Sequence, residues 1–347
     1  MTAPVPFSFG YDPTALISGF FATHSHSQVV VLVDENTHRL CYPLIESVLP
    51  PHRSCILPAG EQHKTLATCE TVWSFFTEAE LDRHGLVIVV GGGVLGDLVG
   101  FCAATFKRGV DFLLIPTTLL AQVDASVGGK LGIDFHHLKN HIGVFREPVT
   151  TLISTAFLAT LPERELRSGF AEVIKHGLIA DRALWDQLVR QPHWQASDWS
   201  KVVAASVDIK YRVVQLDPTE KGPRKTLNFG HTVGHAIESA ALAEGLSIFH
   251  GEAIAVGMVC EAFLSSRKGL LPVPQCEAIT HYLRSVFGTV ALPNGSRVQD
   301  LLLQDKKNKG KRILAALLRQ IGQAVWDVEI TAADVSESLD YYQQTHT

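Results

Sequence analysis

Two histidines one helical turn apart are the residues of this chain whose types and spacing best suit chemistry. The segment NFGHTVGHAIE (228–238) places His231 and His235 four residues apart, with Glu238 nearly one turn further on. A His pair with this spacing on a helix is a familiar arrangement of zinc ligands. A third histidine, His250, stands just before a nearly all-apolar segment, which predicts a buried helix. The residues alone leave open whether His231 or His235 would bind a metal.

A carboxylate lies in another segment with helical spacing. SGFAEVIKHG (168–177) places Glu172, Lys175 and His176 on one face of a predicted helix. One Glu with two His is a ligand set that leaves a zinc position open for a substrate oxygen. A lone His before a helix, such as His250, is more often a capping or core residue, but the three segments together favour a metal site. His176 stays open as a further ligand.

The segment VVGGGVLGD (89–97) joins a predicted strand to a predicted helix through three consecutive glycines. Glycine lets the backbone approach a pyrophosphate, and the N–H groups at a helix N-terminus bind its oxygens. The spacing differs from GxGxxG, so a tight structural turn explains it about as well. Asp34, at the end of an earlier strand, suits a ribose hydroxyl, although turn capping is the commoner role of such an aspartate.

Basic residues gather near these segments in a chain whose net charge is −5. The glycine-containing stretch 121–143 carries Asp124, Lys130, Lys139 and Asn140, which suit a phosphate or carboxylate, although a solvated loop explains this stretch slightly better. Taken together, the basic residues indicate a substrate with several negative charges. The further members of this set are Lys175, Lys210, Arg224, Lys225, Lys306 and Lys307, the last two in a run (304–312) that alone would be a solvated loop.

The elements that must position these residues change character along the chain. Strands at 29–34, 55–57, 86–90 and 112–116 alternate with helices at about 64–80 and from Val94, which predicts a mostly parallel sheet with helices on both faces. Beyond about residue 155, helical periodicity dominates at 162–178, 200–215, 231–244, 251–268 and 274–287, with a weak strand signal near 312–328. We therefore expect an α/β domain over 1–155 and a helical domain over 156–347. Ligands of such sheets bind at the strand carboxyl ends.

Composition excludes several classes of protein. The net negative charge provides no overall basic footprint for nucleic acid. Six cysteines without a CxxC pair favour reduced thiols and a cytoplasmic location. The first residues lack the pattern of a secretory signal, and the most apolar stretch is interrupted by glycines and an aspartate, which disfavours a membrane span.

Considered together, the segments resemble the 3-dehydroquinate synthases of the sugar phosphate cyclase superfamily. The resemblance spans roughly 59–307 and rests on AGEQHK, GGGVLGDLVGFCAATFKRGVDF, IPTTLLAQVDASVGGK, KNHIG, LATLPERE, SGFAEVIKHG, LNFGHTVGHAIE, HGEAIAVGM and DKK, in the family's order. It implies a Rossmann-like NAD-binding domain followed by a mostly α-helical domain for metal and substrate. It also implies conversion of 3-deoxy-D-arabino-heptulosonate 7-phosphate to 3-dehydroquinate and phosphate, a lyase reaction of the shikimate pathway to chorismate and aromatic amino acids.

The resemblance also implies the roles of individual residues. It implies Zn²⁺ or Co²⁺ held by Glu172, His231 and His250, and it implies a homodimer in which Arg108 reaches the neighbouring subunit's site. The NAD contacts that it implies are Asp34, Glu61, Lys64, Gly92, Gly93, Asp97, Thr117, Thr118, Lys130, Lys139, Phe157 and Thr160. The substrate residues that it implies are Asp124, Lys130, Asn140, Lys175, Lys210, Arg224, Asn228, His235, and Lys306 or Lys307.

The chain departs from the family pattern in one loop, where GGKLGID has Leu131 and Asp134 in place of the usual Thr and Asn. Three rivals remain at this point: a sister sugar-phosphate cyclase, a metal-dependent polyol dehydrogenase, and a non-catalytic NAD-binding relative. The dehydrogenase would release reduced cofactor in proportion to product, and the non-catalytic relative would have lost a ligand or a substrate lysine.

Overall fold

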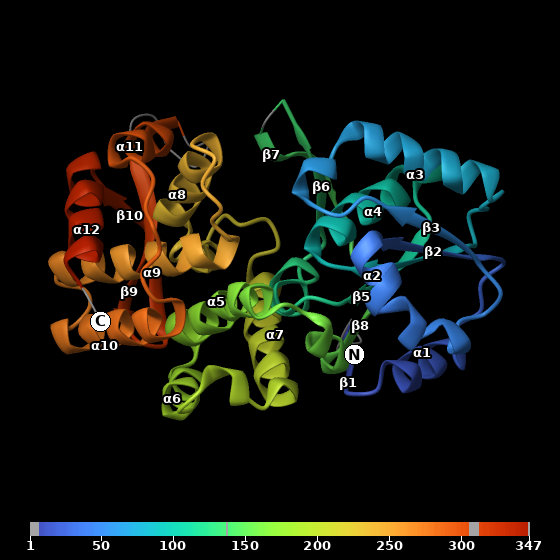
Figure 1. Cartoon of the computed structure of the whole chain (residues 1–347), viewed down its shortest axis with the longest axis horizontal. Coiled ribbons are helices and arrows are strands. Elements are labelled where there is room, and N and C mark those ends of the chain that lie inside the picture. The colour runs from blue at the N-terminus through green and yellow to red at the C-terminus, as the bar shows by residue number, and fades with distance from the viewer. Residues whose placement is uncertain (1–6, 137, 305–311, 346–347) are drawn as a thin grey trace. The chain divides into compact units, whose positions relative to one another are not determined.

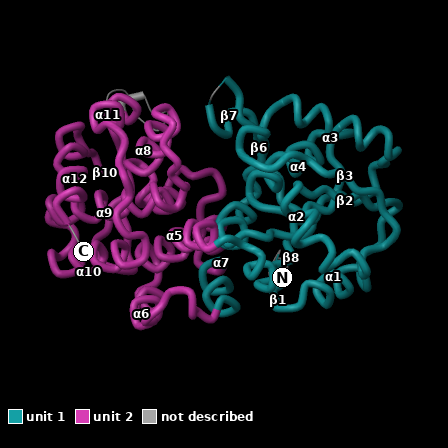
Figure 2. The backbone as a smooth tube through the Cα atoms, viewed as in Figure 1, with its two compact units in different colours: residues 1–162, 199–207 teal, residues 163–198, 208–347 magenta. Residues whose placement is uncertain are grey.

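Two compact units make up the computed structural model, which describes residues 7–136, 138–304 and 312–345. Unit 1 contains residues 1–162 and 199–207, and unit 2 contains residues 163–198 and 208–347 (Figure 2). Helix α7 (Trp199–Leu216) therefore contributes its first half to unit 1 and its second half to unit 2. The expected domain division at 155/156 stays a prediction.

A six-stranded parallel sheet is the centre of unit 1 (Figure 1). Successive residues of its strands enter two hydrophobic clusters, since Val30 and Leu32 belong to one and Val31 and Val33 to the other. Such strands are continuous apolar runs because both faces of the sheet are covered. The strands lie in the order β1 (Phe7–Gly10), β8 (Thr150–Ser154), β5 (Asp111–Pro116), β4 (Leu86–Gly91), β2 (Val29–Asp34) and β3 (Arg53–Leu57).

Helices cover each face of this sheet. α3 (Leu66–Glu78) and α4 (Gly93–Thr105) pack on one face, and α1 (Pro13–Phe21) with α2 (Glu35–Leu40) lies on the other. An antiparallel hairpin of β6 (Lys130–Phe135) and β7 (Leu138–Phe145) contacts α4. The short helices of the unit are η1 (Tyr42–Leu44), η2 (Glu46–Val48), η3 (Glu61–His63), η4 (Phe106–Arg108), η5 (Ala121–Ala125) and η6 (Thr155–Thr160).

Unit 2 is built around α9 (His250–Arg267), which contacts α5 (Glu163–Ala180), α8 (His231–Ala243), α10 (Val273–Phe287) and α12 (Ala332–Gln344). Most residues of α9 are buried because its sequence is apolar on nearly every side. A two-stranded hairpin, β9 (Ile313–Gln320) with β10 (Gln323–Ile330), also packs on α9. The remaining elements of the unit are α6 (Arg182–Arg190), η7 (Trp194–Ala196), η8 (Pro223–Asn228) and α11 (Gly295–Gln304).

The predicted fold class is confirmed, and the predicted strands and helices occur within a few residues of their expected bounds. The stretch 121–143 corrects the preference for a solvated loop, because most of it forms η5 and the β6–β7 hairpin. Its alternating Leu131 and Ile133 are buried against the sheet cluster, a signal that the surrounding glycines obscured. The charged run 305–311 lies outside the described residues.

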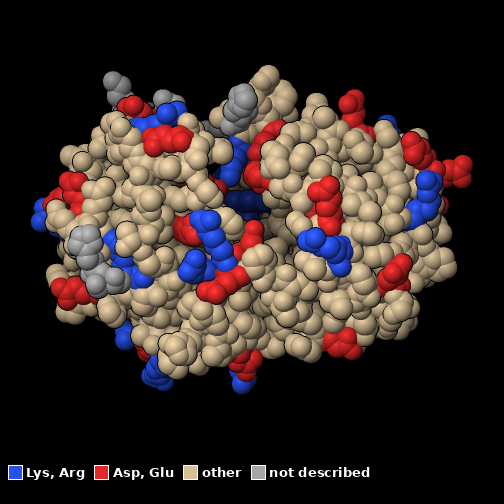
Figure 3. Space-filling model, viewed as in Figure 1, with Lys and Arg blue, Asp and Glu red and all other residues tan. Residues whose placement is uncertain are grey.

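Acidic and basic side chains are interspersed on the face drawn in Figure 3. Across the described residues, none of the helices has the length and apolar character needed to cross a membrane.

Candidate active site

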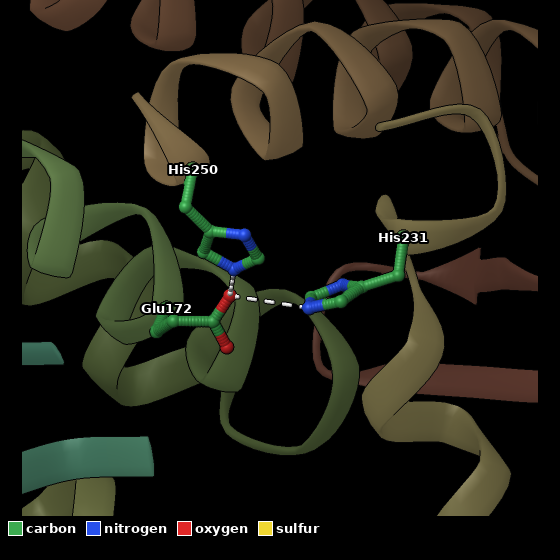
Figure 4. Close-up of side chains that lie close together, drawn as sticks. All are labelled: Glu172, His231 and His250. Atoms are coloured by element: carbon green, nitrogen blue, oxygen red, sulfur yellow. Dashed lines mark ion pairs between the residues drawn. The ribbon is translucent and has the colours of Figure 1, made fainter. Parts of the chain in front are cut away.

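Three helices of unit 2 bring Glu172, His231 and His250 together (Figure 4). Glu172 lies in the middle of α5, and the two histidines are the first residues of α8 and α9. Oε1 of Glu172 is 3.4 Å from Nε2 of His231 and 3.8 Å from Nε2 of His250. Zinc bonds of about 2.0–2.2 Å place neighbouring ligand atoms of a tetrahedral ion roughly 3.4 Å apart, so this spacing fits a bound cation.

Hydrogen bonds on the far side of each ring orient the two histidines. Nδ1 of His231 donates to the main-chain oxygen of Phe229 at 3.1 Å, and Nδ1 of His250 donates to Glu238 at 3.3 Å. A main-chain oxygen cannot donate, so Nδ1 of His231 carries the hydrogen and its Nε2 lone pair faces Glu172. The bond from His250 to Glu238 likewise turns Nε2 of His250 toward Glu172. Such outer partners fix the tautomer and orientation of metal-binding histidines.

Opposing charges perturb the titration of these groups. Burial opposes the charge of Glu172, but Lys175 and the two histidines outweigh it and hold the Glu172 pKa well below its usual range. Burial and the Lys175 charge lower the pKa of His231, which keeps its ring neutral. Burial acts the same way on His250, but hydrogen bonds with Glu172 and Glu238 prevail and raise its pKa to about 9. A cation there would displace the His250 proton.

Other predicted residues of unit 2 surround this group. Lys175 is buried one turn along α5 and forms an ion pair with Glu172. His176, the alternative ligand, is fully buried on the same helix. The ring of His235 lies 5.0 Å from that of His231 and 5.9 Å from that of His250 between centroids. His235, Glu238 and His250 form a second group of possible ligand atoms, so this corner of the unit holds a continuous network.

The loop before α8 presents Arg224 and Asn228. The Asp217 carboxylate accepts the N–H groups of Lys221 at 3.0 Å, Gly222 at 2.6 Å and Arg224 at 3.2 Å. Burial opposes its charge, but these three bonds prevail and lower the Asp217 pKa. The Arg224 guanidinium donates to the main-chain oxygen of Pro218, and the buried Lys210 lies on α7.

Asn228 donates to Glu220 at 2.7 Å. Asp217 and Glu220 were not singled out from the sequence. The DPTEKGP segment that holds them carries a turn signal, which could have located the loop but not its role.

In unit 1, the predicted NAD residues follow the strand carboxyl ends. The glycine turn after β4 leads into α4, whose N-cap is Gly92, a residue without a side chain to cap the helix. A Cβ on Gly93 would come within 2.9 Å of Ala125, so this turn packs closely. Thr117 and Thr118 follow β5, and Thr117 N–H donates to the main-chain oxygen of Gly91 at 3.0 Å.

Asp34 caps α2 by accepting N–H groups of Asn36 at 2.9 Å and Thr37 at 2.8 Å. It also borders a cavity after β2 and β3. The cavity is further lined by Leu57, Pro58, Ala59, Gly60, His63, Thr68, Val94, Leu95 and Leu98. Asp34 therefore has the helix-capping role that is the commoner one for such an aspartate, and it also lines this cavity.

A second network of unit 1 centres on the buried Lys64. Its Nζ donates to Asp97 at 2.7 Å and to Asn140 at 2.6 Å. Oε1 of Glu61 lies 3.8 Å from Nζ of Lys139. Lys139 and Asn140 both lie on β7. The residues predicted at 61, 64, 97, 139 and 140 thus meet, although they come from three segments.

The remaining predicted residues are more scattered. Asp124 lies in η5, and the exposed Lys130 begins β6. Phe157 is buried in a sheet cluster, and Thr160 donates to its main-chain oxygen at 2.7 Å. Arg108 is exposed in η4 with a left-handed φ of 68°. Lys306 and Lys307 lie outside the described residues.

Comparison with known families gives two adjoining matches. Residues 54–168 match the model described as 3-dehydroquinate synthase N-terminal, and residues 169–308 match the model described as 3-dehydroquinate synthase C-terminal. The two matches together span most of the described chain and meet inside α5.

Individual relatives agree over nearly the whole length. A 3-dehydroquinate synthase of Parabacteroides distasonis is 36% identical over 340 residues, with 96% of each chain covered. One of Halorhodospira halophila is 41% identical over 339 residues, with 93% of each chain covered. Among solved structures, 2-epi-5-epi-valiolone synthase from Streptomyces hygroscopicus, with NAD⁺ and Zn²⁺ bound, superposes with a TM-score of 0.84 at 26% identity. That match covers 99% of this chain and 98% of the other.

Proposed function

The chain belongs to the 3-dehydroquinate synthase family, and from this we propose that it converts 3-deoxy-D-arabino-heptulosonate 7-phosphate to 3-dehydroquinate and phosphate. This is the reaction that serves the shikimate pathway. The observation that carries the proposal is the group of Glu172, His231 and His250, with ring nitrogens facing one buried carboxylate beside a buried lysine. Relatives along nearly the full length support the same activity.

Glu172, His231 and His250 would hold a zinc or cobalt ion. The fit rests on their donor types, on the 3.4 and 3.8 Å separations, and on the outer partners that direct each Nε2 inward. When bound, the metal supplies Lewis acidity toward substrate hydroxyls, and NAD supplies a hydride acceptor that is regenerated within each turnover. The role of the three ligand residues themselves is to hold the metal ion and to fix its position.

Buried cations of unit 2 would bind the anionic substrate. Lys175, Lys210 and Arg224 are almost fully shielded from water, and charge-assisted hydrogen bonds from such cations suit a phosphate or carboxylate. Asn228 would exchange its bond with Glu220 for one to a substrate oxygen. His235 is half-buried beside His231 and is the group we assign to moving protons at substrate hydroxyls.

Unit 1 would bind NAD. The free N–H groups at the start of α4 suit the pyrophosphate, and Asp34 beside its cavity suits an adenosine ribose. Lys64, Asp97 and Asn140 would organise the cofactor and substrate end of the site. We expect the other predicted residues, Glu61, Thr117, Thr118, Asp124, Lys130 and Lys139, to contribute through the same loops.

Phosphate release tests the activity directly. Purified full-length protein would receive the heptulosonate phosphate with NAD and Zn²⁺ or Co²⁺, while free phosphate and the absorbance of reduced NAD are followed together. Phosphate release without net accumulation of reduced NAD is the expected result. Accumulation of reduced NAD in proportion to product would indicate a polyol dehydrogenase instead. A folded, metal-loaded sample that releases no phosphate would contradict the proposal.

The same proposal includes a homodimer in which Arg108 acts in the neighbouring subunit's site. Its exposed position in η4 supports this role, because an exposed guanidinium is accessible to a second subunit. Arg108→Ala and His235→Asn subunits, each inactive alone, would be unfolded together and refolded. Mixed dimers then contain one intact site, so about a quarter of wild-type activity should return. No recovery would place Arg108 in its own subunit's site.

We also propose a cytoplasmic location. All six cysteines are free in the structure, and five of them are buried, which suits a compartment that keeps thiols reduced. Detection of a disulfide in protein isolated from its native cells under thiol-trapping conditions would contradict it.

A further inference from the structure

The helix that carries His231 begins on a carboxylate from a different helix. α8 starts directly after Gly230, whose φ of 80° is left-handed, and Gly230 has no side chain to accept the N–H groups of the first turn. Glu261 of α9 accepts two of them, from Gly230 N–H at 2.7 Å and from Val233 N–H at 3.0 Å. The Glu261 side chain is fully buried, so its charge is balanced by these bonds and by the helix dipole.

One peptide group connects this carboxylate to the His231 ring. The N–H of the peptide between Phe229 and Gly230 donates to Glu261, and the C=O of that peptide accepts the Nδ1 hydrogen of His231 at 3.1 Å. Hydrogen bonds in series polarise one another, and a charged acceptor at one end strengthens the next bond. The charge on Glu261 therefore makes the Phe229 oxygen a better acceptor and holds the ring with Nε2 toward Glu172.

The crossing of α8 and α9 leaves little room for this arrangement to shift. A Cβ on Gly257 would lie 1.9 Å from the main-chain oxygen of Gly230, and one on Gly230 would lie 2.5 Å from Met258. A Cβ on Gly234 would lie 2.9 Å from Ile254. Because the two backbones are in direct contact, the position of Glu261 on α9 is transmitted to the entry turn of α8.

We propose that Glu261 is a positioning residue for His231, acting through the Phe229–Gly230 peptide. The inference rests on the proposed function, because it takes His231 as a metal ligand. Glu261 fixes the tautomer and direction of the ring without touching metal or substrate. Its effect should therefore be seen in how tightly and in what geometry the protein binds the metal alone.

Two variants of Glu261 provide the test. Glu261→Gln keeps one acceptor oxygen but loses the charge, and Glu261→Ala removes both acceptors. Zinc affinity of the metal-stripped full chain would be measured by competition with a chromophoric chelator, and the Co²⁺ absorption spectrum would report ligand geometry. We expect affinity to fall on the order of tenfold for Glu261→Gln, the lower end for loss of an outer-shell partner, and further for Glu261→Ala.

Ser265→Ala is the matched control. Ser265 is buried on the same helix, and its hydroxyl accepts the N–H of Leu318 in β9 at 3.0 Å. The same hydroxyl donates to the main-chain oxygen of Glu261 at 2.6 Å, but it does not contact the Glu261 carboxylate that binds the entry turn of α8. Its removal therefore also deprives a buried backbone N–H of its acceptor while leaving that carboxylate in place. Thermal unfolding should show that Ser265→Ala destabilises the protein, while its zinc affinity and Co²⁺ spectrum stay as in the wild type.

His231→Ala separates failure of this inference from failure of the proposed site. Zinc affinity retained in His231→Ala would overturn the ligand assignment and the inference with it. Zinc affinity lost in His231→Ala but unchanged in a destabilised Glu261→Gln would leave the ligand set standing and reduce Glu261 to a helix cap. A graded loss in the order Glu, Gln, Ala, absent from the Ser265→Ala control, supports the inference.

Discussion

In unit 1 the predicted cofactor residues lie in the segments that follow parallel strands and on the β6–β7 hairpin, whereas in unit 2 the proposed metal ligands lie on the flanks and first turns of packed helices. Unit 1 includes an exposed pair, Lys139 with Glu61, although Lys64 beside it is buried. Glu172 and Lys175 of unit 2 are almost completely shielded. Both units position charged side chains, but they should differ in how well they tolerate the substitution of those side chains.

The difference follows from how each charge is balanced. An exposed pair is solvated and screened, so removing one partner costs little. A buried carboxylate among histidines and a lysine depends on every neighbour, and loss of one leaves an uncompensated charge. Substitutions in the helical network should therefore have larger and less local effects than substitutions in the strand loops.

The largest effect is expected when the buried network loses a proposed ligand. Glu172→Gln should release the metal and abolish activity together, by more than the 10- to 100-fold that loss of an outer-shell partner costs. Metal content after gel filtration and phosphate release would be measured side by side, with circular dichroism to verify folding. Full activity in a metal-free Glu172→Gln protein would contradict both the ligand role of Glu172 and the greater sensitivity of the buried network.

A pair of glycines compares the packing of the two units. Gly257→Ala places a methyl group against the Gly230 oxygen at the crossing of α8 and α9, and should destabilise by about 3 kcal/mol or more through overpacking. Gly19 in the exposed part of α1 has nothing within 4 Å of an added Cβ. Gly19→Ala should therefore stabilise by about 0.5–1 kcal/mol. Urea unfolding measures the free energy of unfolding of both variants. Equal changes in the two would contradict the proposed difference in packing.

The network around Lys64 should respond more mildly. Lys64→Met leaves Asp97 and Asn140 without their shared donor, and the affinity for NAD should fall about tenfold, or ~1.4 kcal/mol. Zinc affinity, set in unit 2, should not change. Arg53→Met, which removes a cation bonded to the Glu78 carbonyl on the same unit, serves as the control and should keep wild-type NAD affinity. Calorimetric titration with NAD would measure both, and an equal loss in both variants would point to net charge alone.

The smallest expected effect concerns Asp217, a loop residue within the helical unit. Its pKa is lower in the folded state than in the unfolded chain, so its bonds stabilise the protein above the unfolded pKa near 3.8. That contribution is lost as the pH falls through the folded value. The difference in stability between the wild type and Asp217→Asn should therefore become smaller as the pH is lowered below about 4. Thermal unfolding between pH 3 and 7 tests this, and a difference independent of pH would count against the assignment.

Much of the fold could be predicted because its signals are local. Continuous apolar runs such as VVVLVD and LVIVV predict buried parallel strands, and a period near 3.6 residues predicts the helices of unit 2. The β6–β7 hairpin was missed because its burial depends on contact with α4, and its glycines imitate a loop. β1 and α12 carry signals too short or too polar to be separated from their surroundings.

Sequence alone determined the types of group available to the site: histidines one turn apart, a Glu–Lys pair on one helix face, and a glycine turn before a helix. Spacing along one helix is fixed by backbone geometry, which is why these local sets could be anticipated. Only the tertiary structure decided that Nε2 of His231 and Nε2 of His250 face the same Glu172 oxygen. It also placed Glu261 beneath the first turn of α8. These relations depend on how three helices cross, and helix crossings are set by packing among residues far apart in the chain.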